Sequence, residues 1–111
     1  MPYVLNGQNQ AIPDEPVEMD GRHYVPLAPV VETLGGSVKW DNNMKTADAT
    51  IGQWTAHVQA ENTDVDVNGT HVQLAAPPHI NDGKVWVPWD FFRDAYGYKA
   101  NMEGETLYVH L

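Results

Sequence analysis

Residues 82–97 read Asp82-Gly83-Lys84-Val85-Trp86-Val87-Pro88-Trp89-Asp90-Phe91-Phe92-Arg93-Asp94-Ala95-Tyr96-Gly97. The Asp-Gly pair predicts a tight turn, the Val-Trp-Val run predicts a short strand, and the apolar spacing that ends at the glycine predicts a two-turn helix. An earlier copy spans residues 20–35, 62 positions before, and keeps Asp-Gly-basic, Val-Pro and the terminal glycine in register. This repeat predicts a chain built of two similar halves.

The segments around each copy recur as well. Asn6-Gly7 and Asn68-Gly69 each predict a type I′ hairpin, because Asn-Gly supplies the two residues of positive φ that this turn needs. The first hairpin is expected to return through Ala11-Ile12. After each helix another hairpin is expected, at residues 37–51 and 98–111.

The ends of the two helices are predicted from single residues. Pro29 suits the first helical position, where a missing N–H is harmless. Asp90 is expected to cap the second helix with its side chain. Gly35 and Gly97 stand where a helix ends in a left-handed residue.

Together these signals predict an α+β fold. Antiparallel β-hairpins and two short helices are expected to form two pseudo-symmetric repeats, each ordered hairpin, strand, helix, hairpin. The repeats cover about residues 3–51 and 65–111 and are joined by a half-buried strand at 53–60. Because about 50 residues bury too little surface to fold alone, the halves should share one core in a single domain, 1–111.

Composition excludes several classes of function. Six Lys and Arg against 15 Asp and Glu give a net charge of −9, which predicts no nucleic-acid partner. No apolar run approaches the roughly 20 residues of a membrane-spanning helix, so no membrane insertion is expected. The first residues lack the basic start and apolar core of a signal peptide. The absence of cysteine excludes disulfides and thiolate chemistry.

No set of residues typical of catalysis stands out. Serine occurs once, at Ser37, outside any nucleophile motif, so neither an enzyme nor a cofactor is expected. Asp64, Asp66 and Asn68 match the opening of a calcium loop, but Ala75 stands where its bidentate glutamate belongs. A histidine metal site would need convergence of residues from separate elements, which the sequence leaves open; the histidines are His23, His57, His71, His79 and His110.

The paired segments resemble a known family. Gly21-Arg22 with Val25-Pro26-Leu27, and Gly83-Lys84 with Val87-Pro88, are similar to the copper amine oxidase N-terminal (stalk-like) domain. The resemblance covers nearly the whole chain, about residues 4–109. It implies a non-catalytic accessory module of a bacterial secreted or surface protein, and so an extracellular or cell-surface location.

The chain departs from the family pattern at three positions. The arginine that usually follows Val-Pro-Leu is replaced by Ala28 and by Asp90, and Trp89 takes the place of leucine. Any role of that arginine is therefore lost. The Asn-x-x-Asn-Tyr-acidic pattern of the oxidases' catalytic domain is absent, so the resemblance implies no amine oxidation.

Aromatic residues offer the best candidate for a binding face. Side chains alternate along a strand, so Trp86 and its repeat partner Tyr24 should point away from the helices. They either fill the core, which is favoured, or stand exposed to glycan or protein. Trp40 is expected in the core. The candidate face comprises Trp86, Tyr24, Trp54 and Trp89.

The expected function is therefore an accessory module that either binds glycan or protein or serves as a spacer. The alternative is an assembly or inhibitor module that uses strand edges near Pro13–Pro16 and Pro77–Pro78. A metal-binding domain and a small hydrolase have less support. The oligomeric state stays open.

Overall fold

The computed structural model describes residues 3–110. The helices are α1 (Leu27–Thr33) and α2 (Phe91–Tyr96). The strands of the first half are β1 (Tyr3–Leu5), β2 (Gln8–Asn9), β3 (Val17–Met19), β4 (Arg22–Pro26), β5 (Ser37–Asp41) and β6 (Thr46–Ile51). The remaining strands are β7 (Trp54–Gln59), β8 (Asp64–Val67), β9 (Thr70–Gln73), β10 (His79–Asn81), β11 (Lys84–Pro88), β12 (Lys99–Glu103) and β13 (Thr106–His110).

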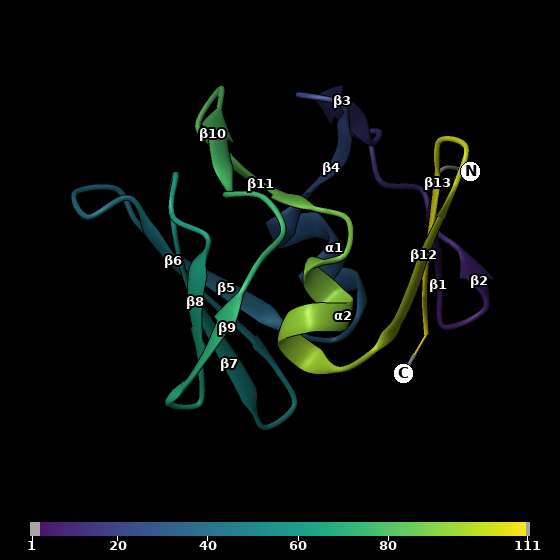
Figure 1. The fold of residues 1–111 in the computed structure, drawn as a ribbon. Coiled ribbons are helices and arrows are strands. Elements are labelled where there is room, and N and C mark those ends of the chain that lie inside the picture. The colour runs from purple at the N-terminus through teal and green to yellow at the C-terminus, as the bar shows by residue number, and fades with distance from the viewer. Residues whose placement is uncertain (1–2, 111) are drawn as a thin grey trace.

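Three sheets surround the two helices (Figure 1). Sheet A has the order β12-β13-β1-β2, sheet B has β10-β11-β4-β3, and sheet C has β5-β6-β7-β8-β9. Helix α1 packs between sheets B and C, and α2 contacts both sheet A and sheet C. The fold is thus mixed α and β with mostly antiparallel strands and two short helices, which confirms the general class predicted from the sequence.

One strand pair differs from the predicted antiparallel pattern. Strand β1 pairs with β13 in parallel, with Tyr3 opposite Leu107 and Leu5 opposite Val109. The amide of Asn6 continues the ladder by donating to the carbonyl of Val109 at 2.8 Å. The two ends of the described chain are therefore neighbouring strands of one sheet.

The turn chemistry read from the sequence is confirmed. Asn6 and Gly7 have φ of 52° and 78°, and Asn68 and Gly69 have φ of 50° and 88°, as a type I′ hairpin requires. The return strand of the first hairpin is shorter than predicted. It ends at Asn9. The amide of Gln10 still donates to the Tyr3 carbonyl at 2.9 Å, and the chain then leaves the sheet and buries Ile12 in the core.

The helix starts correct two predictions, whereas the helix ends agree. Helix α1 begins at Leu27, so Pro29 is its third residue and not its first, still within the turn whose N–H groups have no helical partner. Asp90 occupies the N-cap position of α2, but its side chain makes no capping hydrogen bond. Its carboxylate instead accepts from the Arg22 guanidinium at 3.0 Å. Gly35 and Gly97 are left-handed as predicted, with φ of 93° and 75°.

A single cluster of buried apolar side chains runs from Tyr3 to Val109 and includes both helices and all three sheets. The rings of Phe91 and Phe92 meet edge to face, with ring planes at 89°, and both residues are fully buried. Both can be buried because α2 has sheets on more than one side (Figure 1).

Several elements of the two halves share their bounds at the sequence offset of 62. β3 matches β10, β4 matches β11, and β5 matches β12 residue for residue. Strands β4 and β11 are antiparallel neighbours in the middle of sheet B. That the three-dimensional fold is a pseudo-symmetric duplication, and that residues 1–111 form one domain of two repeats, stay predictions.

Candidate functional site

The structure separates the four aromatic residues of the predicted binding face. Tyr24 and Trp86 are 1% and 7% exposed, so neither presents an open ring, and the favoured burial of Trp86 is confirmed. They are close neighbours in sheet B, where Tyr24 lies opposite Pro88 and Trp86 lies opposite Pro26. The Tyr24 hydroxyl donates to the Pro77 carbonyl at 2.9 Å, and this hydrogen bond holds the buried Tyr24 ring in place.

The other two candidates lie elsewhere. Trp54 is 43% exposed at the start of β7 in sheet C. Trp89 is half-buried beside α2, with the Arg93 guanidinium 5.5 Å from its ring centroid, a cation–π contact. The four residues therefore do not form one exposed face.

Trp40 is the aromatic residue that sequence reasoning misplaced. It was expected in the core but is 38% exposed. It lies opposite Ala47 in β6, and hence on the inner face of sheet C, but β5 is the edge strand and nothing in the sheet covers its outer side. Edge position depends on strand order, which alternation along a single strand does not reveal.

A groove of about 320 Å³ opens between Trp40 and the start of α1. We call it the Trp40 groove; its lining residues are Asp14, Pro26, Leu27, Ala28, Pro29, Val38, Trp40, Gly83, Lys84 and Val85. The half-buried Ala28, Pro29, Val38 and Val85 supply an apolar floor. At the rim, Lys84 Nζ donates to Asp14 Oδ2 at 2.8 Å, which joins the loop before β3 to the start of β11.

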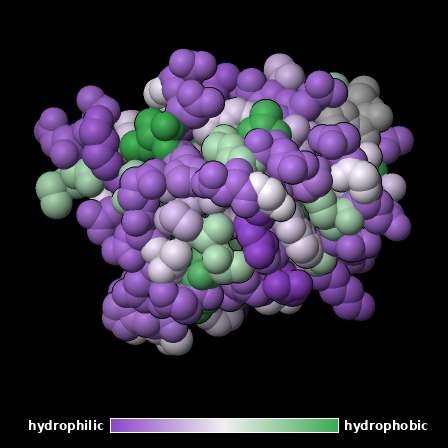
Figure 2. Space-filling view, turned by 45° about the horizontal axis from the view of Figure 1, so that its top comes forward, coloured by the Kyte–Doolittle hydropathy of each residue, from purple (hydrophilic) through white to green (hydrophobic). Residues whose placement is uncertain are grey.

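The face drawn in Figure 2 is mostly hydrophilic, with small and separate apolar spots. The Trp40 groove is a concave, largely apolar site with an exposed indole in its lining. Ligand pockets usually combine such a lining with a few polar groups and have volumes of about 300–1,000 Å³, so the Trp40 groove is at the small end of this range.

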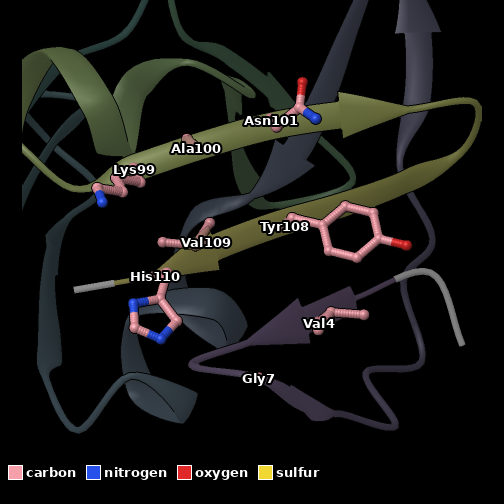
Figure 3. Close-up of a pocket in the computed structure, with 8 residues that line it drawn as sticks. All are labelled: Val4, Gly7, Lys99, Ala100, Asn101, Tyr108, Val109 and His110. Atoms are coloured by element: carbon pink, nitrogen blue, oxygen red, sulfur yellow. The ribbon is translucent and has the colours of Figure 1, made fainter.

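A second hollow, of about 220 Å³, lies on the outer face of sheet A (Figure 3). Strands β12 and β13 supply most of its lining, and β1 contributes Val4. Tyr108 is 38% exposed and lies between Asn101 and Val4 in neighbouring strands. The hollow is shallow because it is formed on the surface of a sheet.

A third hollow, of about 270 Å³, lies near the tip of the β5–β6 hairpin. Lys39, Asp48 and His57 form a row across three strands of sheet C and face away from the helices. His57 Nδ1 and Asp48 Oδ1 are 2.6 Å apart. The lining also includes Trp40 and the exposed Met44, and of its charged residues Asp48 and His57 pair with each other.

The histidines do not assemble a metal centre. His23, His57, His71 and His79 each lie beside one carboxylate, at 2.6 to 3.5 Å. Among residues 3–110 no group of three or more His, Asp or Glu side chains is placed to hold a metal ion.

The residues that resembled a calcium loop form strand β8 and its hairpin. Asp66 Oδ1 accepts the amide of Gly69, and Asn68 Oδ1 accepts the amide of Thr55. These oxygens therefore serve backbone N–H groups of the sheet. Within the described residues no helix is long and apolar enough to span a membrane.

Buried tyrosines carry the largest electrostatic perturbations. Burial raises the pKa of Tyr96, whose hydroxyl donates to the Ala49 carbonyl at 2.7 Å. Burial likewise raises the pKa of Tyr3, whose hydroxyl donates to the Asp14 carbonyl at 2.6 Å. Both phenols tie separate elements together and neither lines the Trp40 groove.

Comparison with known proteins agrees with the resemblance noted in the sequence. The family described as the copper amine oxidase N-terminal domain matches residues 4–111. No curated protein matches the chain. The family match spans nearly every element, from β1 to β13. The chain therefore belongs to the copper amine oxidase N-terminal domain family, a family of non-catalytic accessory domains.

Proposed function

We propose that this domain is a binding module of a bacterial secreted or cell-surface protein, and that its ligand docks in the Trp40 groove. The observation that carries the proposal is the exposed indole of Trp40 beside an apolar floor. Tryptophan at such a site offers a large rigid surface with little conformational entropy to lose on binding.

The chemistry of the groove restricts the ligand. Its lining has one aromatic ring, aliphatic and proline side chains, and one rim ion pair, Asp14 with Lys84. A sugar ring with its C–H face on the indole fits this lining, and so does an apolar side chain of a protein. With a net charge of −9, the protein repels polyanions, so an uncharged glycan or protein segment is favoured.

The alternative, assembly through strand edges, has weaker support. Strands β3 and β10 are the two edges of sheet B, and they follow the proline segments named above. Each has three residues, although Val17 in β3 is 37% exposed. Very short edges next to proline are a common protection against pairing with another chain.

We also propose that the fold arose by duplication, with residues 3–51 and 65–111 related by a pseudo-twofold axis between β4 and β11. The matched strand bounds and the two Asn-Gly turns of equal hand support this. Under this proposal the start of the first helix has an open groove where the start of the second has the buried Phe91 and Asp90.

The binding proposal is tested by titrating soluble bacterial-wall and plant glycans, followed by tryptophan fluorescence and by calorimetry. Trp40→Ala should abolish binding. Trp54→Ala is the matched control, because Trp54 is similarly exposed but lies outside the groove. This variant should bind as the unaltered protein does. Equal loss in both variants would contradict the site, and no response to any wall or plant fraction would leave only the spacer role.

A further inference from the structure

Three polar side chains at the hollow on sheet A, those of Lys99, Asn101 and Tyr108, make no side-chain hydrogen bond or ion pair within residues 3–110. We call the half-buried Val4 and the exposed Lys99, Asn101, Tyr108 and His110 around it the Tyr108 platform (Figure 3). We propose that this platform is a second binding site, for a single ring that carries one carboxylate, either a sugar acid or an aromatic acid. The site lies on a different sheet from the Trp40 groove and does not depend on it.

The sheet register gives the platform a fixed geometry. Asn101 lies opposite Tyr108, and Tyr108 lies opposite Val4 in the parallel pair, so the phenol ring has neighbours on both sides. Lys99 lies opposite His110 at the next same-face position. In Figure 3 the Tyr108 ring projects from β13 on the same side of the sheet as Val4. A ring laid on Tyr108 is therefore within reach of side chains from two further strands.

The charge of the platform is opposite to that of the protein as a whole. The chain has 15 acidic residues, yet the lining of this hollow includes none. Glu103, the acidic residue that shares a face of β12 with Lys99 and Asn101, lies two residues beyond Asn101. A carboxylate placed beside Lys99 therefore meets no carboxylate within the lining.

Three donors of the platform are not used by the described part of the protein. Among residues 3–110, Lys99, Asn101 and the Tyr108 hydroxyl make no ion pair or side-chain hydrogen bond. In contrast Arg22, Lys84 and Arg93 all pair with carboxylates. An ammonium, an amide and a phenol supply the donors that a carboxylate and ring hydroxyls accept.

The size of the hollow fits one ring. Its volume of about 220 Å³ is below the range of about 300–1,000 Å³ that holds drug-sized ligands. Stacking on Tyr108 supplies the apolar contact. A polymer with many carboxylates is disfavoured, because the net charge of −9 repels it.

The test is an NMR titration of the amide signals of the whole chain with glucuronate, galacturonate and 4-hydroxybenzoate, and with uncharged glucose as reference. At least one of the acids should shift the amides of residues 99–101 and 108–110, and binding should weaken as salt is added. Whether the sugar acids or the aromatic acid bind more tightly identifies the source of the carboxylate.

Variants sharpen the test. Lys99→Gln should weaken acid binding roughly two- to fivefold, the range for an exposed ion pair. Lys39→Gln, which removes a lysine outside this hollow, should have no effect. Tyr108→Ala should weaken binding roughly two- to tenfold through lost stacking. Equal binding of glucose and glucuronate, shifts confined to other surfaces, or unchanged affinity in Lys99→Gln would overturn the proposal.

Discussion

The two strand-to-helix junctions follow the same turn, strand and proline, yet one is open and the other is filled. After β4 the chain continues Leu27-Ala28-Pro29, and the Trp40 groove opens there. After β11 it continues Trp89-Asp90-Phe91, where Phe91 is fully buried and Asp90 is 4% exposed. The two junctions differ in the three residues that follow Val-Pro, and this difference accompanies a groove at the first junction and a packed interior at the second.

The basic residues after the two Asp-Gly turns show the same contrast. Lys84 pairs with Asp14 at the exposed rim of the groove, whereas Arg22 pairs with the buried carboxylate of Asp90. Ala28 has no carboxylate to offer Lys84, so Lys84 turns to the loop instead. The small Ala28 side chain lines the groove without filling it.

The largest expected effect comes from removing bulk at the two helix starts. Phe91→Ala should lower the free energy of unfolding by about 3–5 kcal/mol, because it leaves a cavity in the core. Pro29, at the matched position 62 residues earlier, is half-buried beside the groove. Pro29→Ala should therefore change the free energy of unfolding by less than about 1 kcal/mol. Urea unfolding of both variants measures the difference, and similar losses would mean that the junctions are packed alike.

A second pair of variants tests the two ion pairs. Arg22→Ala leaves the Asp90 carboxylate with only Arg93, 3.5 Å away, and should destabilise the fold by about 1–3 kcal/mol. Lys84→Ala removes a partly exposed pair and should stay within about 0.5 kcal/mol. The same unfolding assay applies. A larger loss in the lysine variant would reverse the comparison.

The two helix ends should respond alike, in contrast to the two helix starts. Gly35→Val and Gly97→Val each force a branched residue into a left-handed conformation, at a cost on the order of 1 kcal/mol or more. A Cβ at either position meets no atom within 4 Å, so backbone strain alone sets the effect. Thermal melting checks this, and unchanged midpoints would show that the strain is relieved.

The last prediction concerns the stability of the fold at alkaline pH. Burial raises the pKa of Tyr3 and of Tyr96, one in each half, above the ordinary value of 10.0. Below pH 10 both phenols are neutral in the folded and in the unfolded chain. Above pH 10 the unfolded chain loses phenol protons that the folded chain retains, so the free energy of unfolding should fall as pH rises. Unfolding at pH 9 and pH 11 measures the fall, which should be smaller in Tyr96→Phe; an equal fall would assign it to other groups.

Local signals predicted much of the fold. Asn6-Gly7, Asn68-Gly69 and the two helix-ending glycines were correctly assigned, because their conformations depend on their own backbone and their nearest neighbours. The β5–β6 and β12–β13 hairpins were predicted for the same reason.

Features that depend on distant parts of the chain were missed. The parallel pairing of β1 with β13 joins segments about 100 residues apart and leaves no local pattern. Asp90 was predicted to cap its helix, but the guanidinium of Arg22 takes its carboxylate. The candidate sites could be predicted from the sequence only in part. The exposure of Trp40 and of Tyr108 depends on which strand is an edge and which sheet face is covered.

The parallel pairing of β1 and β13 sets how the domain responds to mechanical load. Tension applied at Tyr3 and His110 pulls the two strands lengthwise in opposite directions, because they point the same way and are held at opposite ends. The hydrogen bonds between them, including that from Asn6 to Val109, are then loaded in shear and must yield together. A hairpin pulled from its open end would instead release its bonds one at a time. The pairing of β1 with β13 therefore resists tension at the two ends of the described chain more strongly than a hairpin would.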